Sequence, residues 1–355
     1  MTPYITILLL SFLLVALDAV QLNRKEKLYF FVPFVALLIV FAGSRPPGID
    51  RDYQWYNTAY GYMKYLGWSH LLQAYALYQF EIGYVFLTKL FYSLGLPFAG
   101  FLFLYEAAMG IVLGRLIYRY SPYPFTSLCM YVCLFYFLRD FTQIRFAFSA
   151  VLLVNGLLKF AEDKRRAGWA CLIVAGLLHN SAWIGLFIPL FYTVFYNRWI
   201  YLLFPPLGYL ISLFHPIQII LSLVGLPQQI TRYLTEHVTI GASIMSYVFC
   251  YVLMILSVFH YEKLKALYGR KFEYLYISFA LSTFIGLMFV EFPIMQRISG
   301  ALFTTSILFV PYIIKTFTEK KWYGYREIFA FGIVLVYFYY GIKLILVGHL
   351  LKPFF

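Results

Sequence analysis

Charged side chains are scarce in this sequence of 355 residues. They make up 12% of the chain, against about 25% in ordinary soluble domains. Hydrophobic residues reach 63% and aromatic residues 22%, and apolar runs recur from end to end. Many of these runs approach the roughly 20 residues that a helix needs to cross a bilayer. The composition therefore excludes a soluble globular protein and predicts a membrane protein.

Acidic residues and cysteines are few as well. Asp and Glu number 15 against 28 Lys and Arg, a formal net charge of +13. In a soluble chain this excess would suggest nucleic acid, but cytoplasmic loops of membrane proteins are rich in Lys and Arg, so we expect no nucleic-acid partner. The four cysteines lie inside apolar runs, without a Cys-x-x-Cys pair or a cluster of histidines. We therefore expect inert packing, no metal site and no cofactor.

The apolar runs predict an all-α polytopic integral membrane protein, a helical bundle that forms a single domain over residues 1–355. The first run, 2–20, has no basic segment before it and no cleavage site after it, which favours a retained span over a signal peptide. About 12 or 13 segments qualify as candidate spans, of which 82–97 is the weakest. They lie near residues 4–20, 28–43, 82–97, 98–118, 122–138, 143–160, 168–180, 182–196, 199–213, 243–259, 273–290, 298–314 and 327–347.

The basic residues predict the orientation of the chain. Clusters at 24–27, 159–166, 263–271 and 315–326 fall at one alternating set of span ends, which the positive-inside rule makes cytoplasmic. Residues 44–81 and 214–242 are then outer loops. Segment 82–97 does not fit a simple crossing. Either it re-enters the membrane, which Lys89, Gly95 and Pro97 favour, or the aromatic stretch 60–80 makes a compensating crossing.

The outer face collects charged groups whose cations are mainly arginines. Arginine offers a rigid fork that binds phosphate or carboxylate at two points, so this face suits a diphosphate ligand. A charge near the apolar start of a helix usually lines a cavity, which favours a function for Arg145 and Arg297, whereas Arg139 beside Asp140 fits an interface anchor better. The groups are Arg45 with Asp50, Arg51 and Asp52; Glu81; Arg139, Asp140 and Arg145; His179; Arg232, Glu236 and His237; and Glu291 with Arg297.

Three of these groups have both a structural and a functional interpretation. His179 lies in a polar break between two apolar runs, which favours function over packing. Arg232 and Glu236 are spaced for helical pairing and equally for a ligand site. After Ser44, two prolines and a glycine end the helix and leave carboxylates beside Tyr53 and Tyr56. Carboxylates next to aromatic rings commonly hold sugars, and a carboxylate is a common general base.

Five motifs follow one another in order along the chain. They are Arg45-x-x-Gly48-x-Asp50-x-Asp52-Tyr53-x-x-Tyr56, Glu81-x-Gly83-Tyr84-x-x-Leu87, Gln143-Ile144-Arg145, His179-x-Ser181-Ala182 and Arg297-Ile298. In these motifs the sequence resembles the EpsG family of bacterial membrane proteins, which groups with the Wzy-type polymerases of O-antigen and exopolysaccharide repeat units. The resemblance implies a fold related to the lipid-dependent GT-C glycosyltransferases.

The resemblance also implies a reaction at the periplasmic face of the bacterial inner membrane. A growing glycan would pass from undecaprenyl diphosphate to a hydroxyl of an incoming lipid-linked repeat unit, with a chain-length regulator as a candidate partner. Arg145 and Arg297, with Arg232 as a further candidate, would stabilise the leaving diphosphate. The base would be Asp52, Asp50 or His179, and Glu81 would orient an arginine. Candidate substrate-binding residues are Arg45, Tyr53, Tyr56, Glu81, Arg139, Arg232 and His237.

Two other classes of protein fit part of this pattern. A flippase for lipid-linked sugars also needs many spans and cations, but transporters usually carry internal repeats and a site near the midplane, and the sequence shows no repeat. An O-antigen ligase shares the lipid diphosphate chemistry and differs only in its acceptor. An acyltransferase that modifies surface glycans would rely on a catalytic histidine and would not need several outer arginines.

Overall fold

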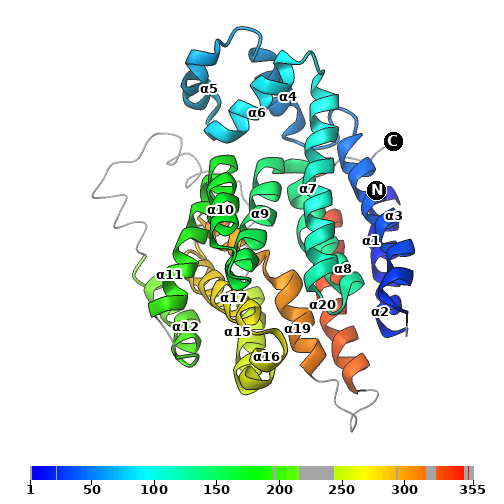
Figure 1. Ribbon diagram of the computed structural model, residues 1–355, viewed down its shortest axis with the longest axis vertical. Helices are drawn as coiled ribbons and strands as arrows, with labels where there is room; N and C mark the ends of the chain where they lie inside the picture. The colour runs from blue at the N-terminus through cyan, green and yellow to red at the C-terminus, as the bar shows by residue number, and fades with distance from the viewer. Residues whose placement is uncertain are drawn as a thin grey trace. The chain divides into compact units, whose positions relative to one another are not determined.

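The computed structural model describes residues 2–20, 22–194, 197–215, 244–292, 295–316, 325–347 and 351 (Figure 1). Within these ranges every regular element is a helix, and the only strand-like pairing is an isolated bridge between Asp50 and Leu351. Among the described residues, four helical stretches are long and apolar enough to cross a membrane, namely Thr2–Ala19, Arg24–Gly43, Phe98–Tyr120 and Ile144–Ala161. The predicted class, an all-α multi-pass membrane protein, is confirmed.

Most predicted spans coincide with helices, but several are short or broken. Two pairs of helices are long and apolar enough to span a membrane only when each pair is taken together. Ile244–Phe259 and Tyr261–Tyr268 are bent by 79°, and Gln296–Phe303 and Ser306–Thr316 by 50°. Three more apolar stretches have 10 to 17 residues. The helices that match predicted spans after residue 120 are α8 (Pro124–Tyr131) with η2 (Val132–Asp140), α9 (Ile144–Ala161), α10 (Arg165–Leu178), η3 (Asn180–Leu186) with α11 (Phe187–Val194), α12 (Ile200–Ser212), α15 (Ile244–Phe259), α17 (Arg270–Met288), α18 (Gln296–Phe303) with α19 (Ser306–Thr316), and α20 (Tyr325–Val347).

The described helices gather in two compact units. The first holds residues 1–155, 173–180 and 317–355, and the second holds 156–172 and 181–316. In the first unit α1 (Thr2–Leu14) and α2 (Ala16–Ala19) pack on α8, while α3 (Arg24–Gly43) lies along α7 (Phe98–Tyr120) (Figure 1). Gly110 permits this close approach, because a Cβ there would lie 2.4 Å from Cγ1 of Ile39. Small residues at such contacts are typical of helices that pack in membranes.

Local sequence explains where the helices α3 and α7 begin. Asn23 accepts a hydrogen bond from the amide of Glu26 (2.9 Å), and the Glu26 carboxylate accepts one from the amide of Asn23 (2.8 Å). This reciprocal capping box satisfies two amides that a helix start leaves without partners. Pro97 precedes α7, where a proline stops the preceding chain from continuing as a helix. The starts of α3 and α7 are therefore set by local sequence.

Between α3 and α7 the chain forms a cap of short helices, residues 53–93. It comprises α4 (Tyr53–Tyr62), η1 (Trp68–His70), α5 (Leu71–Tyr78) and α6 (Ile82–Ser93), which cluster near one end of α7 (Figure 1). The longest, α6, has 12 residues and therefore spans about 18 Å, short of the roughly 30 Å of a bilayer core. Neither 82–97 nor 60–80 forms a crossing helix. With α3 and α7 as neighbouring spans, the orientation predicted from the basic residues is self-consistent.

The second unit is organised around α17. Its neighbours in that unit are α11, α12, α15, α16 (Tyr261–Tyr268), α18 and α19, and fifteen of its nineteen residues are buried. Glu273 in its first turn accepts hydrogen bonds from the hydroxyls of Tyr192 (3.2 Å) and Tyr261 (3.1 Å) and pairs with Lys265 (2.8 Å). A buried carboxylate is tolerated only when it is paired and hydrogen-bonded, and here both conditions hold.

Candidate active site

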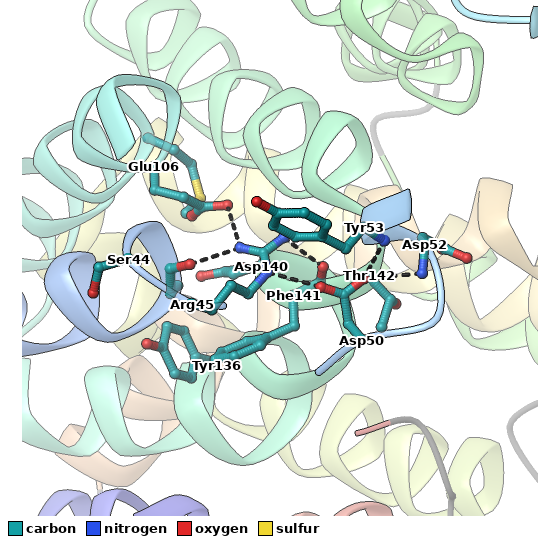
Figure 2. A network of polar contacts seen from close by, with 12 residues as sticks. Ser44, Arg45, Asp50, Asp52, Tyr53, Glu106, Tyr136, Asp140, Phe141 and Thr142 are labelled. Carbon is teal, nitrogen blue, oxygen red and sulfur yellow. Dashed lines mark hydrogen bonds and ion pairs between the residues drawn. The ribbon is translucent and has the colours of Figure 1, made fainter. Parts of the chain in front are cut away.

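The turn after α3 is held by a buried ion pair. Nε of Arg45 donates to Oδ2 of Asp50 at 2.8 Å, and the two side chains are 1% and 0% exposed. The terminal nitrogens of Arg45 donate to the backbone oxygens of Ala42 and Phe141, each at 2.7 Å (Figure 2). Arg45 therefore joins the end of α3 to the residue that follows the π-helical stretch η2. Such a saturated arginine fixes the backbone and leaves little capacity for a ligand.

Asp50 organises the start of the cap. Its Oδ1 accepts hydrogen bonds from the amides of Asp52 (2.9 Å) and Tyr53 (2.7 Å), and its backbone pairs with Leu351. Asp52 itself immediately precedes α4, with its side chain 37% exposed and 3.8 Å from Nε of Arg51. The two carboxylates that the sequence left as alternatives thus differ in environment, one saturated and buried and the other open to solvent.

A second ion pair joins the cap to α9. Arg145, in the first turn of α9, donates through one terminal nitrogen to Glu81, which immediately precedes α6. The guanidinium carbon of Arg145 lies 4.2 Å from the ring centroid of Phe80, 5.7 Å from that of Tyr84 and 5.9 Å from that of Tyr56. Aromatic faces attract a guanidinium at these distances. Arg145 therefore sits in an aromatic cage with one carboxylate partner.

The segment after α10 adds to this site. Oε1 of Glu81 accepts a hydrogen bond from the amide of Asn180 at 3.1 Å, so one carboxylate ties together α6, α9 and the residue after His179. The imidazole of His179 meets the ring of Phe146 edge to face, with centroids 4.9 Å apart. Phe146 also contacts Arg139. The guanidinium carbon of Arg139 lies 4.4 Å from the ring centroid of Phe146 and 4.3 Å from that of Phe135.

A close backbone approach fixes α6 in this arrangement. A Cβ at Gly83 would lie 2.7 Å from the carbonyl oxygen of Leu177, a distance that Cβ atoms essentially never adopt. Glycine at this position therefore lets the start of α6 contact the end of α10. Glu81 and Tyr84, on either side of Gly83, are positioned by this contact.

Burial keeps the tyrosine hydroxyls of the cap protonated. Burial raises the pKa of Tyr56, while the charge of Arg145 lowers it in part. Burial likewise raises the pKa of Tyr84 well above its usual value, against the opposing charge of Arg145, and it raises that of Tyr60 to about 12. These hydroxyls therefore remain neutral hydrogen-bond donors at neutral pH.

The sequence matches one protein family over nearly its whole length. The model of the EpsG family matches residues 27–355. The chain belongs to the EpsG family. Members of this family are Wzy-like polymerases, so the membership suggests a surface-glycan polymerase-like role in polysaccharide biosynthesis. The chain gives no significant match to a curated protein or to a solved structure.

Four of the five motifs that resemble the EpsG family lie in the first compact unit or begin there. Arg45, Glu81, Arg145 and His179 all belong to this unit, and the contacts above connect the last three. Arg297, the second residue of α18, belongs to the second unit and is partly buried. Arg232, His237 and residues 216–242 of the predicted second outer loop lie outside the described residues.

Glu106 is a buried charged residue that sequence reasoning did not single out. It lies within α7, is 1% exposed, and its Oε1 is 3.8 Å from the Arg45 guanidinium (Figure 2). Nearby, the hydroxyl of Tyr131 donates to Oδ1 of Asp140 at 2.7 Å, and Glu106 and Asp140 line a common small cavity. The available signal was an acidic residue inside an apolar run, which is costly in a membrane and therefore informative.

No metal site emerges from the part of the chain that the structure describes, where no three His, Cys, Asp or Glu side chains come close enough together to hold an ion. The free cysteines include Cys129 and Cys133, whose sulfurs are 3.9 Å apart in the buried interior. They lie on consecutive turns, Cys129 in α8 and Cys133 in η2.

Proposed function

We propose that this EpsG-family chain polymerises a surface glycan by transferring it from undecaprenyl diphosphate to an incoming lipid-linked repeat unit. The observation that carries the proposal is the caged Arg145, a buried cation held by Glu81 at the junction of α6 and α9. A permanently charged guanidinium that is already oriented costs little reorganisation when a diphosphate arrives. Its rigid fork matches phosphate oxygens at two points.

The proposed reaction is a displacement at the anomeric carbon of the donor glycan. A hydroxyl oxygen of the acceptor sugar forms a bond to that carbon, the bond from the carbon to the diphosphate oxygen breaks, and the bonding electrons remain on the diphosphate. Arg145 stabilises the charge that develops there. The proton of the hydroxyl passes to a carboxylate, and such general-base assistance contributes roughly 10²–10⁴-fold.

Among the three candidate bases, we assign the role to Asp52. Both oxygens of Asp50 are occupied by Arg45 and two amides, so Asp50 is better suited to hold the turn. Asp52 precedes α4 with its side chain partly open to solvent, one turn before Tyr56, where a sugar hydroxyl could reach it. Tyr56, whose ring contacts Arg145, follows Asp52 by four residues, the spacing that brings side chains to the same side of a helix.

Glu81 has a positioning role in this proposal. A lone buried guanidinium would be strongly unfavourable, so Glu81 neutralises Arg145 while the site is empty and fixes its orientation. Arg297, Arg232, Arg139 and His237 remain predicted substrate-binding or catalytic residues from the sequence.

The proposed location is the bacterial inner membrane with the active face towards the periplasm. The basic residues at 24–27 lie at the start of α3, the end of that span away from the cap, in agreement with the positive-inside rule. A chain-length regulator is the proposed protein partner, and the lipid-linked donor and acceptor are the proposed substrates.

The test is the glycan ladder of the source bacterium after deletion of this gene and complementation. We expect the ladder to collapse to a single repeat unit, and to be restored by the wild type but not by Arg145→Ala or Arg145→Lys. The matched control is Arg198→Ala, which removes an arginine that pairs with Glu262, a residue 76% exposed, and which should leave the ladder intact. Membrane levels of each variant are measured by immunoblot.

Each alternative predicts a different pattern. An unchanged ladder in the deletion strain would contradict polymerisation. Complete loss of surface glycan with accumulation of lipid-linked polymer would indicate a ligase, and accumulation of single lipid-linked units on the cytoplasmic face would indicate a flippase. If Arg145→Ala is absent from the membrane while Arg198→Ala is present, the role of Arg145 is structural.

A further inference from the structure

Three buried hydrogen-bonding groups around Arg145 have no partner in the part of the chain that the structure describes. They are the hydroxyl of Tyr84 on α6, the hydroxyl of Tyr105 on α7, and Nε of Arg145 on α9. Buried polar groups are nearly always hydrogen-bonded, because an unpaired one costs about 1–3 kcal/mol. Three such groups in one neighbourhood therefore require an explanation.

These groups belong to one aromatic cluster. The ring centroids of Tyr84 and Tyr105 are 5.8 Å apart, and Tyr84 lies 5.7 Å from the guanidinium carbon of Arg145. Tyr84 is 1% exposed and Tyr105 is 5% exposed. Edge contacts with Tyr56 and with Phe148 hold the two rings in place, at 5.9 and 5.3 Å respectively. The positions of the Tyr84 and Tyr105 hydroxyls are therefore fixed by the packing of their rings.

The three groups share the ability to donate a hydrogen bond. The Arg145 nitrogen only donates, and a tyrosine hydroxyl that stays protonated can donate one hydrogen bond. A set of donors beside a fixed positive charge suits an oxygen-rich anion. Phosphate oxygens accept several such bonds at once.

We propose that Tyr84 and Tyr105 are diphosphate-binding residues, whose hydroxyls donate to the same phosphate oxygens that Arg145 contacts. This inference rests on the proposed function, because it assigns partners to the lipid diphosphate of that reaction. It assigns Tyr84 a chemical role in the Glu81-x-Gly83-Tyr84 motif, and it adds Tyr105, which no sequence motif singled out.

The proposal requires opposite effects on stability and on binding. Replacing either tyrosine with phenylalanine keeps the ring and removes a hydroxyl that lacks a partner, so the lipid-free protein should keep its stability or gain some. The same change should weaken diphosphate binding, since hydrogen bonds to charged groups contribute strongly. A purely structural role for the hydroxyls would instead lower stability and leave binding unchanged.

The experiment uses the full chain in nanodiscs with glycan-free undecaprenyl diphosphate as the probe and undecaprenol, which has no phosphate, as the reference lipid. We expect Tyr84→Phe and Tyr105→Phe each to weaken binding of the diphosphate by about tenfold or more, with undecaprenol unaffected. Tyr65→Phe is the matched control, because Tyr65 is 76% exposed in the same cap. Thermal unfolding of each lipid-free variant is measured in parallel.

The outcomes separate this inference from the proposed function. If the wild type prefers undecaprenyl diphosphate and Arg145→Ala removes that preference, while both phenylalanine variants bind like the wild type, the tyrosine assignment is wrong and the function stands. If the lipid-free phenylalanine variants unfold at clearly lower temperature, the hydroxyls have partners in the fold and the assignment also fails. If the wild type does not distinguish the two lipids, the proposed function fails together with the inference.

Discussion

Arg145 and Glu81 form an ion pair across 64 residues of sequence, between the first turn of α9 and the residue that precedes α6. Glu81 is 6% exposed, and its second oxygen accepts the amide of Asn180 at 3.1 Å. A single carboxylate thus sets the position of the cap, of α9 and of the residue after His179. The arginine proposed to bind diphosphate is therefore fixed before any ligand arrives.

The first prediction concerns this pair. Glu81→Ala should lower the free energy of unfolding by about 3 kcal/mol, because it leaves Arg145 buried without a counter-charge. Exchanging the charges, with Glu81→Arg and Arg145→Glu together, should recover part of this stability but no polymer, since the diphosphate contact needs the cation on α9. Thermal unfolding in detergent and the glycan ladder give the two measurements. A charge-exchanged protein that polymerises normally would refute a specific role for Arg145.

The two neighbouring aspartates should respond differently to the same change. Asp50→Asn should destabilise the protein by about 3 kcal/mol, because it breaks a fully buried pair with Arg45. Asp52→Asn should alter stability by less than about 0.5 kcal/mol, as exposed substitutions usually do, and should lower the polymerisation rate roughly 10²–10⁴-fold. Rates are measured on lipid-linked units in vitro. Full activity of Asp52→Asn would move the base to another group, with His179 as the next candidate.

The apolar runs predicted the helices of this protein well, because span length and hydropathy are local properties. The cap was not predictable in this way. Its aromatic stretches resemble membrane spans in composition. In the structure they form short helices, two of which, α4 and α6, pack against α7. The family resemblance predicted that Glu81 orients an arginine, but no local rule identifies Arg145 as that arginine, because the two residues are 64 positions apart. Glu106 is different, because an acidic residue inside an apolar run is visible in the sequence alone.

Glu106 gives a third prediction. Its Oε1 has no hydrogen bond from any described residue and lies 3.8 Å from Arg45, which already pairs with Asp50. Glu106→Gln keeps the shape and removes a buried charge, so we expect unfolding to be unchanged or stabilised by about 1 kcal/mol. The measurement is the thermal unfolding of wild type, Glu106→Gln and Glu106→Ala. The alanine variant also opens a void, so it should be less stable than the glutamine variant. A clear loss in Glu106→Gln would mean that its charge is required to balance Arg45.

The ion pair between Arg270 and Asp163 predicts a pH dependence on the predicted cytoplasmic side. The two terminal nitrogens of Arg270 donate to the two oxygens of Asp163, one of them at 2.8 Å, and this hydrogen bonding lowers the pKa of Asp163 below its usual 3.8. A carboxyl whose pKa is lower when folded contributes stability above its unfolded pKa and loses it as the pH falls through the folded value. We therefore expect wild type and Asp163→Asn to differ by a constant amount between pH 5 and 8 and to converge below about pH 4. Divergence at low pH would contradict the pairing.

The last prediction tests whether the contact between α6 and α10 positions the site. Gly83→Ala places a Cβ 2.7 Å from the carbonyl oxygen of Leu177, so α6 must move away and carry Glu81 and Tyr84 with it. Overpacking of this kind costs about 1–3 kcal/mol, and we expect polymerisation to fall further than stability alone explains. Gly61→Ala is the matched control, because a Cβ at Gly61 meets no atom within 4 Å; alanine should be neutral or slightly stabilising there. Equal polymer from both variants would show that the site tolerates a displaced α6, and the positioning role of Gly83 would then be wrong.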